Sequence, residues 1–394
     1  MRRIAFLLQT LTGGGAERTV ANLSFPLSDK FEVYIILFDG SKVSYPHKGT
    51  IIDLKAPSRK TSIGKVFNIL RRTVKLRKIK KEYNFDVTVS FMFSANIINV
   101  MSRYNDKIIT SIRNYMSGYG MTKGLKKQER FTGLRSDKII AISEIVRQDL
   151  IHNFDLPQEI IETIYNPCDV ERINRIADEE VDFEFDNELF YFVTAGRLVH
   201  QKGQWDLIKA FSLVSKERDN ARLIILGEGT LKERLQKLTE DAMISDKVFF
   251  MGFQDNPYAY MKKSNAFVLT SLHEGLGNVV LEALACGLPI ISTDCYAGPR
   301  EILAPDSNLL EKTEKECECK YGVLVPQISN EEDFSLNLTL EHEELAKAML
   351  KILDSQDLRQ KYAQRSSERI KDFDPRVIAG QWEKTLLEIG NNNE

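Results

Sequence analysis

Residues 270–300 read TSLHEGLGNVVLEALACGLPIISTDCYAGPR, from Thr270 to Arg300. With the apolar segment that precedes it, this stretch predicts a strand, a tight glycine-containing turn, a helix and a second buried strand. These elements are expected at Ala266–Thr270, 274–277, Asn278–Ala285 and Ile290–Thr293. The stretch is therefore a β–turn–α–β unit, the repeat of an α/β fold with a parallel sheet.

The turn in this unit predicts a binding site for an anion. Backbone N–H groups from Gly275 to Val279 lie at the positive end of the following helix, where a phosphate binds without any special side chain. Glu274 and Glu282 add carboxylates that accept hydrogen bonds from sugar hydroxyls. The loop therefore suits a phosphorylated ligand rich in hydroxyls. The alternative is an ordinary structural unit whose glutamates are solvated.

The composition is that of a soluble globular protein with two domains. The chain has 394 residues, of which 43% are hydrophobic and 28% are charged. No apolar run approaches the roughly 20 residues of a membrane-spanning helix. Met1–Leu8 is expected to form a first strand, not a signal peptide. The five cysteines lack the spacing of a disulfide framework, which suits a reducing cytoplasm.

The net charge of −2 conceals two halves of opposite sign. Residues 1–165 contain 27 Lys and Arg against 15 Asp and Glu, a formal charge of +12, whereas the remainder has a formal charge of −14. The N-terminal half is therefore the half expected to meet an anionic partner.

Many of these basic residues fall in one predicted helix, Thr61–Tyr83. No acidic residue occurs between Lys55 and Glu82. Apolar residues recur at helical spacing, at Ile63, Phe67, Leu70 and Val74. Such a helix lies on an anionic membrane surface or lines a groove for a polyanion. The alternative is a packed helix with a solvated outer face. Nucleic acid is not expected, because aromatic interleaving and a binding motif are absent.

Four other segments carry expectations of their own. Gly13–Gly15 is a loop before a helix, where the backbone can approach an anionic ligand, but the GxGxxG spacing of dinucleotide-binding folds is not met. Residues 116–130 are expected to be a basic loop that contacts a membrane or an acceptor. Residues 169–185 are expected to be an irregular, acidic domain boundary. The acidic insertion 306–320 is expected to be a surface loop, because Cys317 and Cys319 lack a second ligand pair for a metal.

Several motifs occur in a recognisable order along the chain. They read GGGAER near the N-terminus, ISE near residue 143, IYNPCDV, AGRLVHQKG, ILGEGTLKERL, MGFQDN and HEGLGNVVLEALACGLPIISTD. In this order they resemble the retaining nucleotide-sugar glycosyltransferases of family four (group 1), over nearly the whole chain. The resemblance implies a GT-B fold, an α/β architecture of two Rossmann-like doubly wound parallel-sheet domains that face a central cleft. Residues 1–170 would form the acceptor-side domain, joined by the C-terminal helix 375–394, and residues 171–374 the nucleotide-sugar-binding domain.

The resemblance also implies roles for individual residues. Arg197 and Lys202 would clamp the donor diphosphate, and cations there stabilise the negative charge that builds on the leaving phosphate without a metal. Glu274 would position the donor sugar near the reacting carbon, as a third catalytic residue and not as a covalent nucleophile. The remaining donor-binding residues would be Gly14, Gly15, Glu228, Phe253, Gly275, Leu276, Gly277, Asn278 and Glu282.

One position departs from the family pattern. Many members carry a histidine after the strand that ends here at Ser111, but this chain has Ile112-Arg113-Asn114. Any role of that histidine is therefore either lost or transferred to Arg113 or Asn114, and Arg113 would offer a fixed cation and donors but no base. The candidate acceptor or membrane contacts are Arg113, Asn114, Arg71, Arg72, Lys75 and Lys78.

The sequence therefore predicts a retaining transferase that moves a hexose or N-acetylhexosamine from a UDP-sugar to a polyprenyl-diphosphate-linked glycan, in surface polysaccharide or glycan biosynthesis. It is expected to need no metal or other cofactor, and to be cytoplasmic, attached peripherally to the inner face of the cell membrane. One alternative is a glycosyltransferase with a soluble or protein acceptor. Another is a non-catalytic, glycosyltransferase-like partner subunit.

Overall fold

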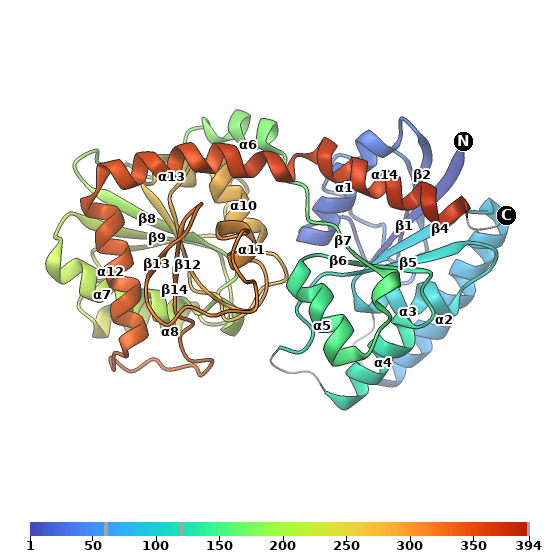
Figure 1. Cartoon of the computed structure of the whole chain (residues 1–394), viewed down its shortest axis with the longest axis horizontal. Coiled ribbons are helices and arrows are strands. Elements are labelled where there is room, and N and C mark those ends of the chain that lie inside the picture. The colour runs from blue at the N-terminus through green and yellow to red at the C-terminus, as the bar shows by residue number, and fades with distance from the viewer. Residues whose placement is uncertain (59–61, 119–121, 392–394) are drawn as a thin grey trace. The chain divides into compact units, whose positions relative to one another are not determined.

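A computed structural model describes residues 1–58, 62–118 and 122–391. The chain divides into two compact units, one made of Met1–Pro167 with the segment from Phe373 onward, and the other of Cys168–Asp372 (Figure 1). The first division therefore lies three residues before the predicted boundary at 170.

The sheet of the first unit has seven parallel strands in the order β3-β2-β1-β4-β5-β6-β7. Their apolar runs are unbroken because both faces are buried: Ile4 and Phe6 of β1 pack into one core, and Ala5 and Leu7 into another. The strands are β1 (Arg2–Leu8), β2 (Phe31–Leu37), β3 (Thr50–Asp53), β4 (Val87–Phe91), β5 (Lys107–Ile112), β6 (Lys138–Ala141) and β7 (Ile161–Thr163).

Helices cover both faces of this sheet (Figure 1). They are α1 (Gly15–Leu27), α2 (Ser62–Tyr83), α3 (Phe93–Met101), α4 (Lys123–Gly133), α5 (Glu144–Phe154) and α14 (Pro375–Asn391), with a short 3₁₀ turn at Gln158–Ile160. The C-terminal helix α14 packs on α1 and belongs to the first unit. Its Trp382 is fully buried, with its ring centroid 5.8 Å from that of Phe91.

The sheet of the second unit has the order β10-β9-β8-β11-β12-β14-β13 and is parallel except for β13. The strands are β8 (Phe190–Ala195), β9 (Ala221–Leu226), β10 (Val248–Gly252), β11 (Ala266–Leu269), β12 (Ile290–Thr293), β13 (Cys317–Glu318) and β14 (Val323–Val325). The helices are α6 (Val170–Ala177), α7 (Gln204–Glu217), α8 (Lys232–Asp241), α9 (Pro257–Lys263), α10 (Asn278–Ala285), α11 (Pro299–Leu303), α12 (Leu340–Asp354) and α13 (Gln356–Arg369), with 3₁₀ turns at His200–Lys202 and Ile370–Phe373. Each unit is thus a Rossmann-like α/β domain, and the predicted fold class is confirmed.

Two segments predicted to be irregular are helices. The carboxylate of Asp169 accepts a hydrogen bond from the backbone N–H of Arg172 at 3.0 Å and caps α6, which buries Ile173 and Ala177. In the same way the hydroxyl of Thr122 caps α4. The prediction of a loop over 116–130 is therefore wrong from residue 123 onward, and residues 119–121 lie outside the described part of the chain. Both helices are short, with 11 residues in α4 and 8 in α6, so each offers only a few turns over which helical spacing can be recognised in the sequence.

The insertion 306–320 is not wholly a surface loop. Its residues Cys317 and Glu318 form β13, which pairs antiparallel with β14 at the edge of the second sheet. In the described ranges of the chain, no helix is long and apolar enough to cross a membrane.

Candidate active site

The predicted donor-binding residues of the second unit follow neighbouring strands of its sheet. Phe253 follows β10, Glu228 follows β9, Arg197 and Lys202 follow β8, and Glu274 follows β11. These strands are adjacent and parallel in the order β10-β9-β8-β11, so their carboxyl ends bring the loops into one row.

Close backbone approaches fix the loops against one another. Gly203 has a φ of +58°, and a Cβ there would lie 2.3 Å from the carbonyl oxygen of Thr270. A Cβ on Gly227, with a φ of +136°, would lie 2.0 Å from the carbonyl oxygen of Gly196. Both positions require glycine, because an added side chain would collide with backbone. The loops of the row therefore contact directly through their main chains.

Lys202 and Glu274 form the central ion pair of this row. Lys202 Nζ lies 2.6 Å from Glu274 Oε1, and both side chains are largely buried. The hydroxyl of Ser271 donates to the same oxygen at 2.6 Å. The stem of Lys202 passes over Gly196, where a Cβ would lie 3.2 Å from Lys202 Cε. The carboxylate of Glu274 is thus held by a cation and a hydroxyl, which orient it as an acceptor.

Arg197 supplies the available positive charge at the site. It is exposed, and its guanidinium makes no hydrogen bond or ion pair with any residue in the described ranges. Lys202, the other cation expected to clamp the diphosphate, is paired with Glu274. An incoming phosphate would share Lys202 with that carboxylate.

The turn after Glu274 leads into α10 as predicted. Gly275, Leu276 and Gly277 are buried, and Gly277 has a φ of +85° as the N-terminal cap of the helix. Asn278 and Glu282 are half-buried on α10. The hydroxyl of Tyr258 on α9 donates to Glu282 Oε1 at 3.4 Å, so a tyrosine joins this carboxylate.

Glu228 and Phe253 lie together at the far end of the row. A Cβ on Gly252, next to Phe253, would lie 2.9 Å from Glu228 Oε1. Glu228 is exposed and pairs with Lys232 at 2.9 Å. The Phe253 side chain is 71% exposed. An aromatic ring so open to solvent offers a surface for stacking of a planar ligand.

The loop that follows β12 supports the turn that carries Glu274. The backbone N–H of Glu274 donates to the carbonyl oxygen of Tyr296 at 3.0 Å. Gly298 has a φ of +95°, and a Cβ there would lie 2.1 Å from the carbonyl oxygen of Leu276. The loop after β12 therefore touches the turn at two points.

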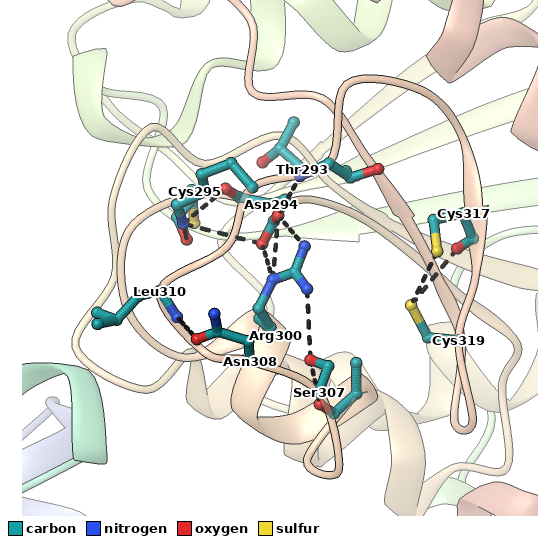
Figure 2. Close-up of polar contacts among 12 residues, drawn as sticks. Thr293, Asp294, Cys295, Arg300, Ser307, Asn308, Leu310, Cys317 and Cys319 are labelled. Atoms are coloured by element: carbon teal, nitrogen blue, oxygen red, sulfur yellow. Dashed lines mark hydrogen bonds and ion pairs between the residues drawn. The ribbon is translucent and has the colours of Figure 1, made fainter.

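The loop after β12 is itself held by a buried ion pair (Figure 2). Arg300 Nε lies 3.1 Å from Asp294 Oδ1, and both side chains are buried. From the insertion, Lys312 Nζ donates to the carbonyl oxygens of Asp294 at 3.0 Å and Cys295 at 3.1 Å. The insertion 306–320 thus holds the loop after β12 in place, and this loop in turn supports the turn that carries Glu274.

Gly14 and Gly15 begin α1 in the first unit. The side chain of Glu17 folds over this point, since a Cβ on Gly14 would lie 2.3 Å from Glu17 Oε2. An anion at the N-terminus of α1 would therefore meet a carboxylate already placed there.

Arg113 and Asn114 lie at the carboxyl end of β5 and point in different directions. Asn114 is exposed, whereas Arg113 is buried and its guanidinium lies 5.4 Å from the ring centroid of Phe91. The guanidinium donates to the hydroxyl of Thr19 at 2.9 Å and to the side chain of Asn166. Burial lowers the pKa of Arg113 to about 9. Arg113 is thus held by residues of the first unit, whereas Asn114 is open to solvent, and the acceptor contact expected of both stays a prediction.

Three of the four predicted contact cations on α2 donate to backbone carbonyls of the segment before it. Arg71 donates to Lys55 at 2.9 Å, Arg72 to Ala56 at 2.8 Å and Lys75 to Leu54 at 2.6 Å. Arg72 is buried against the ring of Phe38, so its assignment as a membrane contact is wrong. Lys78 is exposed.

In the ranges 1–58, 62–118 and 122–391, no group of three or more His, Cys, Asp or Glu side chains is placed to hold a metal ion. The sulfur atoms of Cys317 and Cys319 lie 3.8 Å apart as free thiols on the edge of the second sheet (Figure 2).

Sequence reasoning missed Ser271, Tyr258 and the Asp294–Arg300 pair. Tyr258 and Glu282 lie on different helices, so no sequence spacing relates them. Ser271 does carry a signal, because it stands three residues before Glu274 in the quoted stretch.

Comparison with known proteins identifies the family of the chain. The family "Glycosyltransferase Family 4" matches residues 13–172, and the family "Glycosyl transferases group 1" matches residues 176–318. An uncharacterized glycosyltransferase of Methanocaldococcus jannaschii is 35% identical over 82% of this chain and 84% of its own length.

A second relative is N-acetylgalactosamine-N,N'-diacetylbacillosaminyl-diphospho-undecaprenol 4-alpha-N-acetylgalactosaminyltransferase of Campylobacter jejuni. It is 29% identical over 98% of this chain and all of its own length. Among solved structures, HepE of Anabaena in complex with UDP matches 98% of this chain and all of its own with a TM-score of 0.74 at 18% identity, a likeness of fold. The chain therefore belongs to the group 1 glycosyltransferases of the GT-B fold.

Proposed function

We propose that this glycosyltransferase moves a hexose or N-acetylhexosamine from a UDP-sugar to a polyprenyl-diphosphate-linked glycan, with retention at the anomeric carbon. The observation that carries the proposal is the row of Phe253, Arg197, Lys202 and Glu274 at the carboxyl edge of one sheet. This order matches the order of parts in a nucleotide sugar: base, diphosphate, sugar.

The diphosphate is assigned to Arg197 and Lys202. Cleavage of the bond to the sugar builds negative charge on the leaving phosphate, and two cations stabilise that charge more in the transition state than in the ground state. Because these cations supply the stabilisation, the proposed reaction needs no metal ion. The amides at the start of α10 add a second source of positive potential.

Glu274 is assigned to positioning of the sugar. A carboxylate oxygen that already accepts hydrogen bonds from Lys202 and Ser271 is a weak nucleophile, because both donors stabilise its charge. Its other oxygen is available to accept from a sugar hydroxyl. The departing phosphate then takes the acceptor proton on the same face of the sugar, which gives retention without a protein base.

The uracil nucleotide is assigned on two grounds. Phe253 offers an exposed ring beside the acceptor Glu228, which suits a planar base and its ribose. HepE of Anabaena, of the same fold, has been crystallised with UDP. The half-buried Glu282, which Tyr258 approaches, is assigned to the ribose hydroxyls.

The lipid-linked acceptor is proposed from a relative and from charge. The Campylobacter relative is named for transfer to a glycan on diphospho-undecaprenol. Residues 1–165 of this chain have a formal charge of +12, which suits a diphosphate on an anionic membrane surface. The proposed location is the inner face of the cell membrane, where the protein would attach peripherally.

A transfer assay tests the proposal. The protein is incubated with a panel of UDP- and GDP-sugars and three acceptors: a polyprenyl-diphosphate disaccharide, the free disaccharide and a protein. We expect UDP release and an α-linked product on the lipid acceptor, read by mass spectrometry and by the anomeric coupling in NMR. A β-linked product would contradict retention. Transfer to the free sugar or protein alone would overturn the lipid acceptor, and no turnover with any pair would indicate a non-catalytic subunit.

A further inference from the structure

Helix α2 packs Leu76 into a core of the first unit, yet it also carries apolar residues on its outer side. Its apolar residues Val66, Phe67, Leu70 and Val74 are exposed by 62%, 54%, 55% and 56%. We call these four residues the α2 stripe. At 100° per residue they fall within an arc of about 100°, so they form one continuous apolar strip on the outer side of the helix.

Beside Leu76, the inner side of α2 also carries polar groups. Asn68, Arg72 and Lys80 are buried. The side-chain amide of Asn68 donates to the carbonyl oxygen of Pro57 at 2.8 Å. Lys80 Nζ lies 2.7 Å from the carboxylate of Asp106. These contacts fix the rotation of the helix about its axis. A rotation that buried the stripe would expose Asn68 and Lys80 and would leave the buried carboxylate of Asp106 without its cation.

Cations continue the outer side where the stripe ends. Arg77, Lys78 and Lys81 are exposed on the last turns of α2. No acidic residue lies between Lys55 and Glu82 to neutralise them. On the same side of the sheet, α3 contacts both α2 and α4, and α4 carries exposed Lys123, Lys126 and Lys127 (Figure 1). The surface thus combines an apolar strip with a wide cationic border.

We propose that the α2 stripe inserts into the surface of an anionic lipid bilayer, with Arg77, Lys78 and Lys81 in the headgroup layer. The chemistry fits both parts, since acyl chains take up apolar side chains and anionic headgroups attract the cations. A second copy of the chain fits less well, because a two-fold contact would bring the same cations face to face. The helix lies on the bilayer, since no helix in the described ranges can cross one.

The inference deepens the proposed function and rests on it for its purpose, which is to bring a lipid-linked acceptor to the first unit. It also changes the expected contact. Arg71, Arg72 and Lys75, which the sequence predicts as membrane contacts, hold the segment 54–56 instead. The apolar residues of the α2 stripe make the contact.

Vesicle flotation of the full chain tests the surface. The stripe variant Phe67→Ser/Leu70→Ser/Val74→Ser is compared with Met243→Ser, which removes an 88% exposed methionine from the second unit. On phosphatidylglycerol–phosphatidylcholine vesicles, we expect the stripe variant to bind at least about tenfold more weakly and Met243→Ser to bind like the parent. Lys78→Glu/Lys81→Glu should lose the preference for anionic over pure phosphatidylcholine vesicles.

Tryptophan fluorescence locates the contact between α2 and the bilayer directly. The emission of a Phe67→Trp variant should shift to the blue with vesicles and be quenched by lipids brominated on the acyl chain. Equal binding by the stripe variant, or no shift for Phe67→Trp, would overturn the inference. A stripe-dependent dimer in light scattering without vesicle binding would also overturn it, in favour of a second copy.

Activity assays distinguish a failure of this inference from a failure of the proposed function. The stripe variant should hydrolyse free UDP-sugar at the parental rate, which also shows that it is folded. Normal vesicle binding without transfer to any lipid acceptor would overturn the function and leave the surface intact. Transfer to a detergent-solubilised lipid acceptor by a protein that never binds vesicles would overturn the surface alone.

Discussion

Lys202 and Glu274 stand 72 residues apart in the chain and meet at 2.6 Å. A buried carboxylate that loses its cation is strongly destabilised, whereas loss of both partners removes the unpaired charge. We therefore expect Lys202→Met and Glu274→Gln each to lower kcat/KM about 10²-fold or more. The double variant should lose less than the product of the two losses, because the partners act as a unit.

A double-mutant cycle on transfer rates measures this coupling. The matched control is Lys237 and Asp241, an exposed pair at 3.4 Å on α8, where Lys237→Met and Asp241→Asn should leave kcat/KM unchanged. Strictly multiplicative losses at Lys202 and Glu274 would show that the two residues act independently.

Glu129 on α4 gives a pH prediction of a different kind. It is buried, and burial raises its pKa to about 7. Between the pKa of the unfolded chain and that of the folded one, the folded state binds more protons. The contribution of Glu129 to stability is therefore largest at low pH and falls as the pH rises toward 7.

The substitution Glu129→Gln removes this loss of stability at high pH, because the amide carries no charge. We expect the variant to be more stable than the parent at pH 8, by a few kcal/mol at most, and similar to it at pH 5. Urea unfolding at both pH values measures the difference. An advantage of equal size at pH 5 and pH 8 would contradict the titration of Glu129.

Residue types were predictable at the donor site, but their pairing was not. A carboxylate in a glycine turn and two cations after a strand are visible in the sequence, because their spacing follows from the β–α repeat. Lys202 Nζ lies 2.6 Å from Glu274 Oε1 because strands β8 and β11 are neighbours in the sheet. These two strands are not consecutive in the sequence, so the pairing could not be predicted from it. Arg113 illustrates the same limit, since burial against Phe91 is a property of the packed unit.

At the scale of elements, the insertion 306–320 has a role that its acidic composition conceals. Lys312 holds the backbone of Asp294 and Cys295, and the next residue, Tyr296, accepts the backbone N–H of Glu274. Lys312 therefore positions the turn that carries Glu274, the residue proposed to orient the donor sugar. Burial lowers the pKa of Lys312, and the nearby charge of Asp294 opposes this shift.

Lys312→Met should loosen the Glu274 turn and raise the KM for UDP-sugar several-fold, while the inhibition constant of UDP stays unchanged. This difference is expected because UDP lacks the sugar that Glu274 orients. Lys312→Arg should restore most of the affinity, since a guanidinium also donates to two carbonyls. Equal changes for UDP and UDP-sugar would instead indicate a general loss of structure.

Element type was predictable where both faces of a strand are buried. β1 reads as an unbroken apolar run because alternate side chains enter two cores. The short helices α4 and α6 were missed, because their existence depends on one capping side chain each and on a few buried residues. The rotation of α2 could not be predicted either, since it is set by Asp106 and by the carbonyls of 54–57, outside the helix.

At the scale of the whole molecule, the two units have separate cores, and α14 is part of the first. Trp382 is fully buried and lies in one core with Phe91, Val20 and Ile4. The proposed donor residues Arg197, Lys202 and Glu274 are all in the second unit. A defect in α14 should therefore weaken the first unit without changing the geometry of the donor row.

Trp382→Ala should destabilise the first unit by about 3–5 kcal/mol, because it leaves a large cavity that the sheet and α1 cannot close. In calorimetry this should lower one unfolding transition. UDP should still raise the midpoint of the other, because a ligand stabilises the unit that binds it. A matched control is Val377→Ala, at an exposed position on the same helix. If Trp382→Ala abolished the stabilisation by UDP, the nucleotide would depend on the first unit as well, and the assignment of the donor site to the second unit alone would be wrong.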